Sequence, residues 1–506
     1  MTRQLNRTSH WWVEVHRHKD QPLNLTRLIV SAGTRKGMGE PAGTFHVTLK
    51  GSSEPGQWQM DLLEAIPDDA WVMCGATDAD GVDWVVMIGL VDAIRRQRIG
   101  SAGATTYTIQ GRDHGKILTK TDLLDMPWLA TDLGSVNGSA ALLEDWLKRD
   151  NSRSPGSTVD ALLQSFLGGV IRPKYRSWAV PESMVLPSNG ASVPLERRQF
   201  SDVLSRKIQM DLPGRRYSDV IIPTGVSTGG GLWATMAQNA NLAMNEMFCD
   251  LVPTSIYRPF NMVDGSFSAL PGVTLRQRPF PAVADIPLVI DNKVVSENGG
   301  PPPSDDWRVL PATNLPESDF DVMEVGKSGA ERFNWFSMEP GNGDEMATRG
   351  AQALLAGETP ASKYWDSAPV VLLGSIERHG RTLLQPGSIY LAPDGKSNEL
   401  WLGTAWARVL RDWYAPNAAF LSGTASVAYL CPGIHIGERL RVHMNDGGVE
   451  EYYIESVEHR YTRNSDGSSH GTTHLGITRG WRLSDPSQDY AAEVERWLRN
   501  NLEAST

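Results

Sequence analysis

The sequence predicts a β-dominated α+β protein with two β-barrel domains, each interrupted by helical or mixed insertions. Short segments with the two-residue period of half-buried strands occur near both ends of the chain. Segments with helical periodicity separate them. A strand–loop–strand pattern near the C-terminus also resembles one in the first quarter of the chain, which indicates a β unit that occurs twice.

The repeated pattern is clearest between residues 450 and 481. There Ile454-Glu455-Ser456-Val457 is followed by a polar loop and by His474-Leu475-Gly476-Ile477. In the earlier copy, Val91-Asp92-Ala93-Ile94 is followed by a basic, Gly-rich loop and by Thr106-Tyr107-Thr108-Ile109. Two unrelated long hairpins would give a similar pattern, so duplication and coincidence both stay open at this point.

Length and composition set the class of protein. A chain of 506 residues exceeds one hydrophobic core and predicts three or four domains. Hydrophobic residues make up 40% and charged residues 21%, which is ordinary for a soluble globular protein. The 48 Gly and 31 Pro residues favour turn-rich β structure, and the net charge of −11 excludes a general electrostatic attraction to nucleic acid.

The cysteines and the apolar segments bear on where the protein is made. Cys74, Cys249 and Cys431 lie far apart within apolar runs, which predicts buried free thiols and not a disulfide framework. The first twelve residues contain no apolar signal segment, and no run reaches the ~20 apolar residues that a membrane helix needs. We therefore expect synthesis in a reducing cytosol and no association with a membrane.

Taken in order, the periodicity changes several times. Predicted strands cover Trp11–Val15, Leu28–Val30, Phe45–Leu49, Trp71–Gly75, Trp84–Val91, Val273–Phe280, Arg332–Met338 and Leu440–Met444, in addition to the two hairpins. Predicted helices cover Ala140–Leu147, Val159–Phe166, Phe200–Met210, Leu232–Met247, Met346–Leu355, Trp401–Trp413 and the amphipathic Gln488–Leu502.

These elements divide the chain into seven predicted segments. They are 1–115, the main part of the first barrel; 116–245, a mostly helical insertion; 246–300, a β segment that completes or bridges the first barrel; 301–340, the start of the second barrel; 341–424, a mixed helical insertion; 425–484, the completion of the second barrel; and 485–506, a C-terminal amphipathic helix.

Motifs of known catalytic and ligand-binding sites are missing from the sequence. It contains no Walker loop, no GxSxG and no HExxH. The Gly-rich run Gly225–Gly231 lacks the lysine of a phosphate-binding loop, so we interpret it as the lead into a helix. His470 and His474 share one face of a predicted strand, but zinc requires three or four protein ligands and no third lies nearby.

Two clusters of like charge, one acidic and one basic, also occur in the N-terminal quarter of the sequence. The acidic group near residue 80 lies beside glycines, which fits a hairpin turn; it comprises Asp78, Asp80 and Asp83. The basic group of a loop, Arg95, Arg96 and Arg98, fits a solvated face or a subunit contact better than nucleic-acid binding. We assign no catalytic, cofactor-binding or metal-binding residues from the sequence, and we expect no cofactor.

An ordered set of segments resembles the baseplate hub proteins of contractile phage tails and related injection systems, the late control protein D-like family. These segments are Ile88–Asp92, Thr108–Asp113, Lys116–Leu118, Asn245–Asp250, Leu275–Phe280, Glu331–Asn334, Arg378–Arg381, Tyr452–His459 and Thr478–Gly480. One departure is His379, where the family usually has Tyr or Phe. The resemblance extends over most of the chain, and its specificity lies in the ordered set.

The resemblance implies a non-enzymatic homotrimer with two tube-type β-barrels per chain, forming a pseudo-sixfold ring in the virion tail baseplate. The ring would join the hexameric tail tube to the trimeric central spike and line the DNA channel without binding DNA specifically. Implied partners are the tail tube protein or a tube initiator, the central spike protein, baseplate wedge proteins and the tape measure protein. It also implies synthesis in the host bacterial cytoplasm.

Two functions from other classes stay open. One is a tail-associated cell-wall-degrading enzyme, since some relatives of the hub family carry a lysozyme or peptidase domain, although nothing in this sequence matches one. The other is a monomeric carbohydrate-binding β-protein. The 17 Trp residues are compatible with each of these functions, because aromatic side chains are enriched at interfaces and also fill cores.

Overall fold

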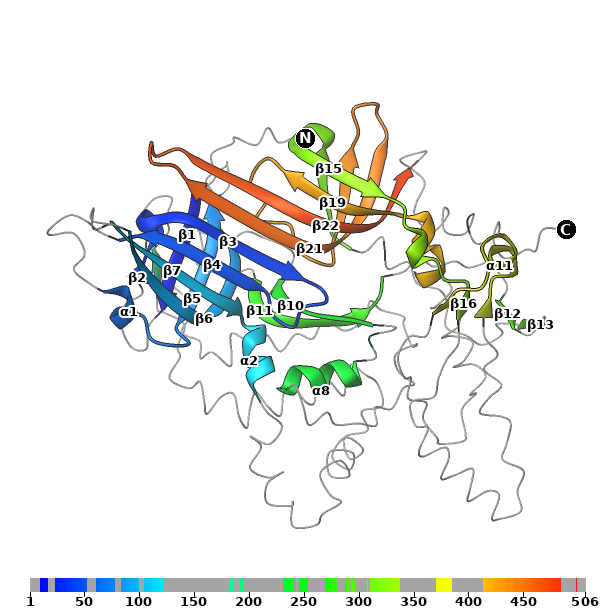
Figure 1. Cartoon of the computed structure of the whole chain (residues 1–506), viewed down its shortest axis with the longest axis horizontal. Helices are drawn as coiled ribbons and strands as arrows, with labels where there is room; N and C mark the ends of the chain where they lie inside the picture. The colour runs from blue at the N-terminus through cyan, green and yellow to red at the C-terminus, as the bar shows by residue number, and fades with distance from the viewer. Residues whose placement is uncertain are drawn as a thin grey trace, which may run out of the picture.

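The computed structural model describes a β-rich molecule in which most strands belong to one large curled sheet (Figure 1). The described residues are 10–16, 23–51, 61–77, 83–99, 104–121, 183–185, 192–194, 231–240, 242, 245–253, 269–279, 288–290, 293–295, 307, 310–336, 370–384, 413–483 and 497.

The first β unit lies in the N-terminal quarter of the chain. Its strands are β1 (His10–His16), β2 (Leu23–Asn24), β3 (Ile29–Gly37), β4 (Thr44–Lys50), β5 (Trp71–Thr77), β6 (Asp83–Ile99) and β7 (Ala104–Asp113). A 3₁₀ turn, η1 (Thr26–Leu28), precedes β3. In the sheet these strands follow the order β3-β4-β7-β6-β5-β1-β2, and all neighbours are antiparallel.

The second β unit is built from segments that are far apart in the sequence. Its strands are β14 (Ala312–Pro316), β15 (Phe320–Gly326), β19 (Leu421–Val427), β20 (Arg439–His443), β21 (Val449–Arg463) and β22 (Ser469–Leu483). A 3₁₀ turn, η5 (Glu317–Asp319), precedes β15. The order is β15-β19-β22-β21-β20-β14.

The same five-strand order therefore occurs twice, as β3-β4-β7-β6-β5 and as β15-β19-β22-β21-β20, with antiparallel neighbours throughout. Two of the β-bulges in each unit also correspond, whereas the irregularities in the β5–β6 and β19–β22 pairs and at Glu451/Tyr453 of β21 have no counterpart. Each unit has a bulge at the second residue of the strand that follows the 3₁₀ turn, at Val30 and at Asp321. Each also has one within the long hairpin, at Asp92 and at Glu455. Because a bulge is specific to its place in a ladder, these positions align the two units residue by residue.

The units differ beside their fifth strand. In the first unit β1 lies antiparallel to β5, whereas in the second β14 lies parallel to β20. In chain position β14 matches β2, since each comes shortly before the 3₁₀ turn. Their directions also match, because β2 runs in the same direction as β5, and β14 runs parallel to β20.

Strand β21 joins the two units into one sheet. Along one side it pairs with β22 over its whole length. Along the other side residues 449–453 pair with β20, and residues 456–462 pair antiparallel with β3 of the first unit. The result is a single sheet of thirteen strands that carries both units (Figure 1).

Each unit has its own buried core. The first is filled by side chains such as Trp11, Val47 and Ile109, with Leu430 and Tyr461 from the second unit. The second is filled by Val427, Val442, Tyr452, Ile477 and their neighbours. The alternation of β4, in which Phe45, Val47 and Leu49 are buried while their neighbours are not, shows how the two-residue period directs one face of a strand inward.

The remaining elements flank this sheet. The helices are α1 (Leu62–Ala65), α2 (Gly115–Lys120), α8 (Gly231–Asn239) and α11 (Leu373–His379), with 3₁₀ turns η6 (Gly329–Glu331) and η9 (Ala415–Ala419). The described part of the chain also contains three smaller sheets. Two are hairpins, β8 (Ser183–Val185) with β9 (Ser192–Pro194) and β10 (Asn245–Pro253) with β11 (Ala269–Gln277). The third has five strands: β12 (Leu288–Ile290), β13 (Lys293–Val295), β16 (Trp335–Phe336), β17 (Val370–Val371) and β18 (Leu383–Leu384).

The β-dominated α+β class predicted from the sequence is confirmed. Both predicted hairpins are present, as β6–β7 and β21–β22. Ile109 lies opposite Ile94, and Leu475 lies opposite the equivalent Val457. Ile109 therefore corresponds to Leu475, and not to Ile477 two residues later, as the sequence comparison of the second strands predicts. The three cysteines are buried free thiols, as expected.

Two predicted elements are wrong. The helix predicted for Leu232–Met247 ends at Asn239, and Asn245 begins β10, because pairing with β11 overrides a periodicity that fits either structure. In the strand predicted for Arg332–Met338, the first three residues are not strand and β16 covers Trp335–Phe336, while the last two lie outside the described residues.

Several other predictions fall on residues that the structure does not describe. They are the helices predicted for Ala140–Leu147, Val159–Phe166, Phe200–Met210 and Met346–Leu355, and nearly all of those for Trp401–Trp413 and Gln488–Leu502. The limits of the seven predicted segments, and the closure of each unit into a barrel, stay predictions. Within the described residues, no helix is long and apolar enough to cross a membrane.

Gly480 on β22 provides a test of the packing between strands. A Cβ added there would lie 2.0 Å from Tyr452 Cε1, and the Tyr452 ring is fully buried. We expect Gly480→Ala to lower the free energy of unfolding by about 1–3 kcal/mol through overpacking, as measured by chemical denaturation. Gly39→Ala is the matched control, because an added Cβ there has no atom within 4 Å. Equal effects of the two substitutions would contradict the packing described.

Candidate functional site

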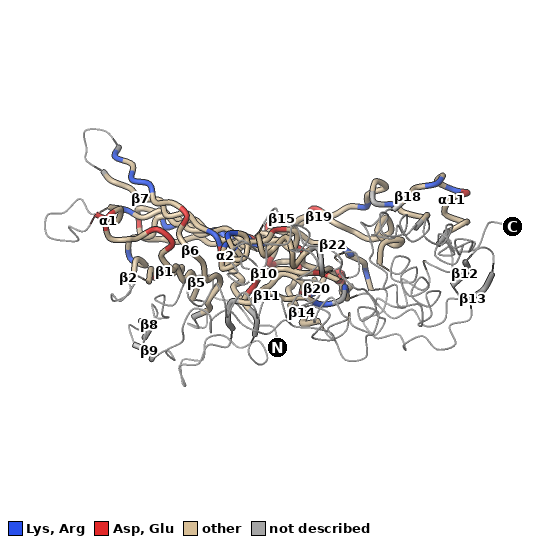
Figure 2. The backbone as a smooth tube through the Cα atoms, turned by 90° about the horizontal axis from the view of Figure 1, so that it is seen from below, with Lys and Arg blue, Asp and Glu red and all other residues tan. Residues whose placement is uncertain are grey.

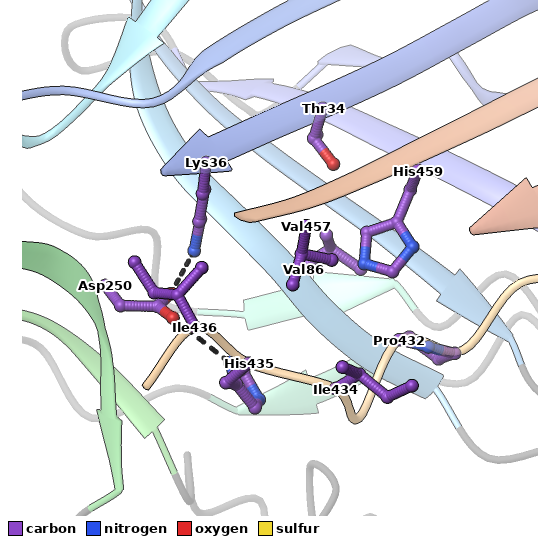
Figure 3. Close-up of a pocket in the computed structure, with 10 residues that line it drawn as sticks. All are labelled: Thr34, Lys36, Val86, Asp250, Pro432, Ile434, His435, Ile436, Val457 and His459. Carbon is purple, nitrogen blue, oxygen red and sulfur yellow. Dashed lines mark hydrogen bonds and ion pairs between the residues drawn. The ribbon is translucent and has the colours of Figure 1, made fainter. Parts of the chain in front are cut away.

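A group of buried charges lies where the two units meet, on both sides of the β10–β11 hairpin. Lys36 comes from the end of β3, Asp250 from the middle of β10, and His435 from the segment between β19 and β20 (Figure 3). The alternation of β3 buries Thr34 and Lys36 while Arg35 between them is exposed, so the lysine faces the junction.

Asp250 binds both cations. Lys36 Nζ donates to Oδ1 of Asp250, and His435 Nδ1 lies 3.4 Å from its Oδ2. The side chains of Lys36 and Asp250 are only 9% and 4% exposed, so the ion pair is shielded from water. A small cavity beside the pair leaves room for about one water molecule, which is too little for a ligand (Figure 3).

The protonation states of Asp250 and His435 depend on the charges beside them. Burial alone would raise the pKa of Asp250, but the positive charges of Lys36 and His435 outweigh it and hold the pKa below its usual range. Burial likewise opposes the charged form of His435, yet Asp250 raises the pKa of this imidazole above 6.5. The carboxylate is thus ionised at neutral pH, and His435 stays protonated to a higher pH than a free imidazole.

His459 on β21 lines the same cavity but is neutral. Burial, followed by the nearby positive charges of His435 and Lys36, lowers its pKa to about 3. Its Nδ1 lies 3.0 Å from Thr473 Oγ1, and that oxygen already accepts a hydrogen bond from the Cys431 amide. This hydrogen bond between the threonine hydroxyl and the imidazole fixes the orientation of the ring.

The β10–β11 hairpin is also bound to each unit separately. Towards the first unit, His114 Nε2 lies 2.7 Å from the carbonyl oxygen of Gly272, and since burial keeps the pKa of His114 low, the neutral ring donates this bond. Towards the second unit, the Tyr453 hydroxyl donates to both carboxylate oxygens of Glu246 at 2.7 Å. Arg276 bonds the same carboxylate and the Gly437 carbonyl.

Gly437 is required by this contact. It has φ of +78°, and an added Cβ would lie 2.5 Å from Arg276 Nη2 and 2.9 Å from the Phe248 ring. Both the left-handed backbone and the close approach of the arginine therefore favour glycine here.

A second cluster surrounds the bulge in β6. The bulge directs Asp92 towards the neighbouring strand, where Arg112 Nε donates to it at 2.8 Å. Lys116 from α2, with a side chain only 1% exposed, reaches Asp92 Oδ1 at 2.8 Å and the Val91 carbonyl at 2.8 Å. In the second unit the corresponding bulged residue, Glu455, accepts a hydrogen bond from Thr478 at 3.0 Å. The bulged carboxylates thus make equivalent cross-strand contacts in both copies.

A third cluster is centred on buried Asn334. Its Oδ1 accepts from the Thr382 amide at 2.7 Å, and its Nδ2 donates to the Gly380 carbonyl at 2.7 Å. Arg381 lies over the Trp335 ring at 5.1 Å. Glu331–Asn334 and Arg378–Arg381, two segments that carry the family resemblance, are therefore neighbours in space.

The candidates that the sequence singled out are not brought together. His474 Nε2 lies 3.2 Å from Thr472 Oγ1, and His470 is exposed. No group of three potential metal ligands occurs among the described residues. Of Gly225–Gly231 only the last residue is described, where its φ of +73° begins α8. Of the three aspartates near residue 80, only Asp83, the first residue of β6, lies within the described part.

The basic residues that the sequence places in a loop lie on a strand in the structure. Arg95, Arg96 and Arg98 are exposed along the projecting end of β6, where Figure 2 shows a run of basic positions. Arg96 also bonds Asp61 at the start of α1.

Sequence reasoning missed Lys36 and His435 entirely. Asp250 and His459 were noted only as members of resembling segments. Nothing in the local sequence connects Lys36 with Asp250, since 214 residues separate them. They meet because the β10–β11 hairpin lies against the end of β3.

The chain is thus a β-rich protein with an internally repeated strand order and a buried ionic junction between the copies. No family model and no curated protein matches it.

Solved structures with which the chain aligns include phage tail proteins and VgrG complexes. A tail protein from Neisseria meningitidis MC58 is 11% identical, with 93% of this chain and 96% of that chain covered and a TM-score of 0.38. A 43 kDa tail protein of prophage MuSo2 from Shewanella oneidensis is 11% identical, with 93% and 98% covered and a TM-score of 0.41.

A Francisella PdpA–VgrG complex in its lidded form is 9% identical, with a TM-score of 0.39. The match covers 95% of this chain but only 53% of that chain, about half its length.

The ion pair between Lys36 and Asp250 can be tested by a double-mutant cycle. Asp250→Asn leaves a buried lysine without its counter-charge and should cost about 3–5 kcal/mol of unfolding free energy. With Lys36→Met in the same chain the loss should be smaller than the sum of the two single effects, by at least ~1 kcal/mol. Asp446→Asn, which removes the exposed pair with Arg482, is the control and should change the denaturation midpoint little. Additive single effects would contradict a direct interaction.

The raised pKa of His435 predicts a pH dependence. A group whose pKa is higher in the folded state contributes stability that is complete below its unfolded value of 6.5 and is lost as pH rises through the folded value. The difference in unfolding free energy between the native chain and His435→Asn should therefore be largest near pH 6 and shrink towards pH 9. Denaturation curves at both pH values measure it, and a difference that grows with pH would contradict the assignment.

Proposed function

We propose that this protein is a structural hub of a contractile phage tail or a related injection system. Three copies form a ring with pseudo-sixfold symmetry, which joins the hexameric tail tube to the trimeric central spike and surrounds the channel through which DNA passes. The proposal places the protein in the tail baseplate of the virion after synthesis in the host bacterial cytoplasm.

The observation that carries this proposal is the repeated strand order with matched bulges within one continuous sheet. A chain with two similar units, present in three copies, offers six similar positions around one axis. Such a ring can contact a sixfold partner on one face, whereas the insertions and termini, which occur once per chain, offer threefold contacts on the other.

The ionic junction supports the same role. A ring that adapts one symmetry to another needs a fixed geometry between the two units of each chain. The bonds of Asp250 to Lys36 and His435, and of Glu246 to Arg276 and Tyr453, fix the β10–β11 hairpin against both units. These charged groups are buried and bind one another, an arrangement suited to rigidity and not to presenting a reactive group to a substrate.

The proposed partners are a second and third copy of the chain, the tail tube protein or a tube initiator, the central spike protein, baseplate wedge proteins and the tape measure protein. DNA passes through without specific binding, and the net charge of −11 is compatible with a channel that does not retain a polyanion. The proposal includes no enzymatic activity, no cofactor and no membrane contact.

Oligomeric state tests this proposal directly. The purified chain should have a mass three times its 55.6 kDa in multi-angle light scattering at micromolar concentration. Negative-stain electron microscopy of the same sample should show a threefold ring with a central hole. A stable monomer would contradict the hub function.

The alternative function as a tail enzyme is checked on the same sample by a zymogram with cell-wall substrate. We expect no clearing. Clearing that disappears when one carboxylate is substituted would favour the enzyme and overturn the non-catalytic part of the proposal.

A further inference from the structure

The two units leave two strand edges without a pairing partner among the described residues. Beyond Leu90, where pairing with β5 ends, β7 is the only strand in the described part of the chain that pairs with the far half of β6. Strand β15 likewise has β19 as its one partner among the described strands. Open edges of this kind can pair with another chain, and proteins normally cover or protect them.

The internal repeat shows what fits these two edges. By the bulge alignment, residues 93–99 of β6 correspond to residues 456–462 of β21, and residues 322–326 of β15 correspond to residues 31–35 of β3. Within the chain, the corresponding segments of β21 and β3 pair with each other, antiparallel. The open edge of β6 is therefore equivalent, by the repeat, to the edge of β21 that pairs with β3. The open edge of β15 is equivalent to the edge of β3 that pairs with β21.

We propose that residues 95–99 of β6 pair antiparallel with residues 322–326 of β15 in a second copy of this chain. The register follows from the internal pair, in which Arg460 lies opposite Gly33, and places Gln97 opposite Glu324. Ile99 then lies opposite Val322. This inference rests on the proposed ring and specifies which strands close it.

The chain cannot make this contact with itself within the observed sheet. Six strands lie between β15 and β6, namely β19, β22, β21, β3, β4 and β7. The basic end of the β6–β7 hairpin projects away from the body, and β15 lies elsewhere in the molecule (Figures 1 and 2). The partner must therefore be another chain.

The charges of the two edges are complementary. In the proposed register Arg95 is diagonal to Glu324 and Arg98 is diagonal to Asp321, a spacing that long side chains span across a sheet. The three arginines of β6 and both acidic residues of β15 are exposed in the single chain. Val322 is also 59% exposed, and pairing would cover this apolar side chain.

The charge pattern also separates this contact from the internal one. Within the chain the paired segment of β21 carries one acidic and one basic residue, Glu458 and Arg460, and Glu458 lies opposite Arg35 of β3. In the proposed contact between chains, the β6 segment carries only basic charges and the β15 segment only an acidic one. Exchange of partners would place β6 against Arg35 and Lys36, so like charges disfavour it.

Disulfide cross-linking tests the proposed register. Gln97→Cys and Glu324→Cys are introduced together; residues opposite each other in an antiparallel pair have Cα atoms ~4.5–5.5 Å apart, within the range of a disulfide. Mild oxidation should convert most of the chain to covalent oligomers ending at a trimer on non-reducing gels. A mixture of the two single variants should give covalent dimers, which shows that the bond joins different chains. Cys74, Cys249 and Cys431 are buried, so they should not contribute.

The matched control combines Gln97→Cys with Val322→Cys, which lies two residues out of register at a diagonal of ~7–8 Å. It should cross-link several-fold less. Equal or stronger cross-linking of this control would overturn the register. If light scattering shows trimers of both double variants but neither cross-links, the strand pairing is wrong while the hub function stands. If the native chain is monomeric, both proposals fail.

Discussion

The antiparallel pairing of β21 with β3 is the contact on which the rest of the structure depends. Strand β21 is long enough to pair with β20 at one end and with the first unit at the other. Backbone hydrogen bonds across this pair merge two separate cores into one sheet, and they also place Lys36, His459 and the segment around His435 beside the β10–β11 hairpin. The same pairing brings His435 and His459 of the second unit close to Lys36 of the first.

Those buried charges follow from the same constraint. Taking an ammonium and a carboxylate out of water is costly, so a buried pair contributes little net stability but penalises any arrangement in which one partner is lost. Such a cluster is suited to defining one geometry, because a shift of β10 relative to either unit would leave Asp250, Lys36 or Glu246 unpaired. The separate cores supply the stability of each unit, whereas the ionic junction defines how the units are placed.

Repetition has a further structural consequence. When one chain contains two similar units, an internal contact between them leaves the corresponding surfaces open at both ends. Among the described residues, the internal β21–β3 pair is therefore matched by open edges on β6 and β15. In the proposed ring these edges would pair between chains, and their charges, basic on β6 and acidic on β15, would distinguish that contact from the one within a chain. The bulges at Asp92 and Glu455 keep the register of the long hairpin alike in both units.

The sequence by itself determined the β-dominated class, the strand periodicity, both long hairpins and the segments that carry the resemblance, because alternation and turn residues are local properties. It could not determine that Leu232–Met247 divides into a helix and a strand, since β10 exists only because β11 pairs with it. Nor could it connect Lys36, Asp250 and His435, which meet only after the two units join. Those contacts, and the strand edges left open, depend on pairing between residues hundreds of positions apart, and only the tertiary structure decides such pairing.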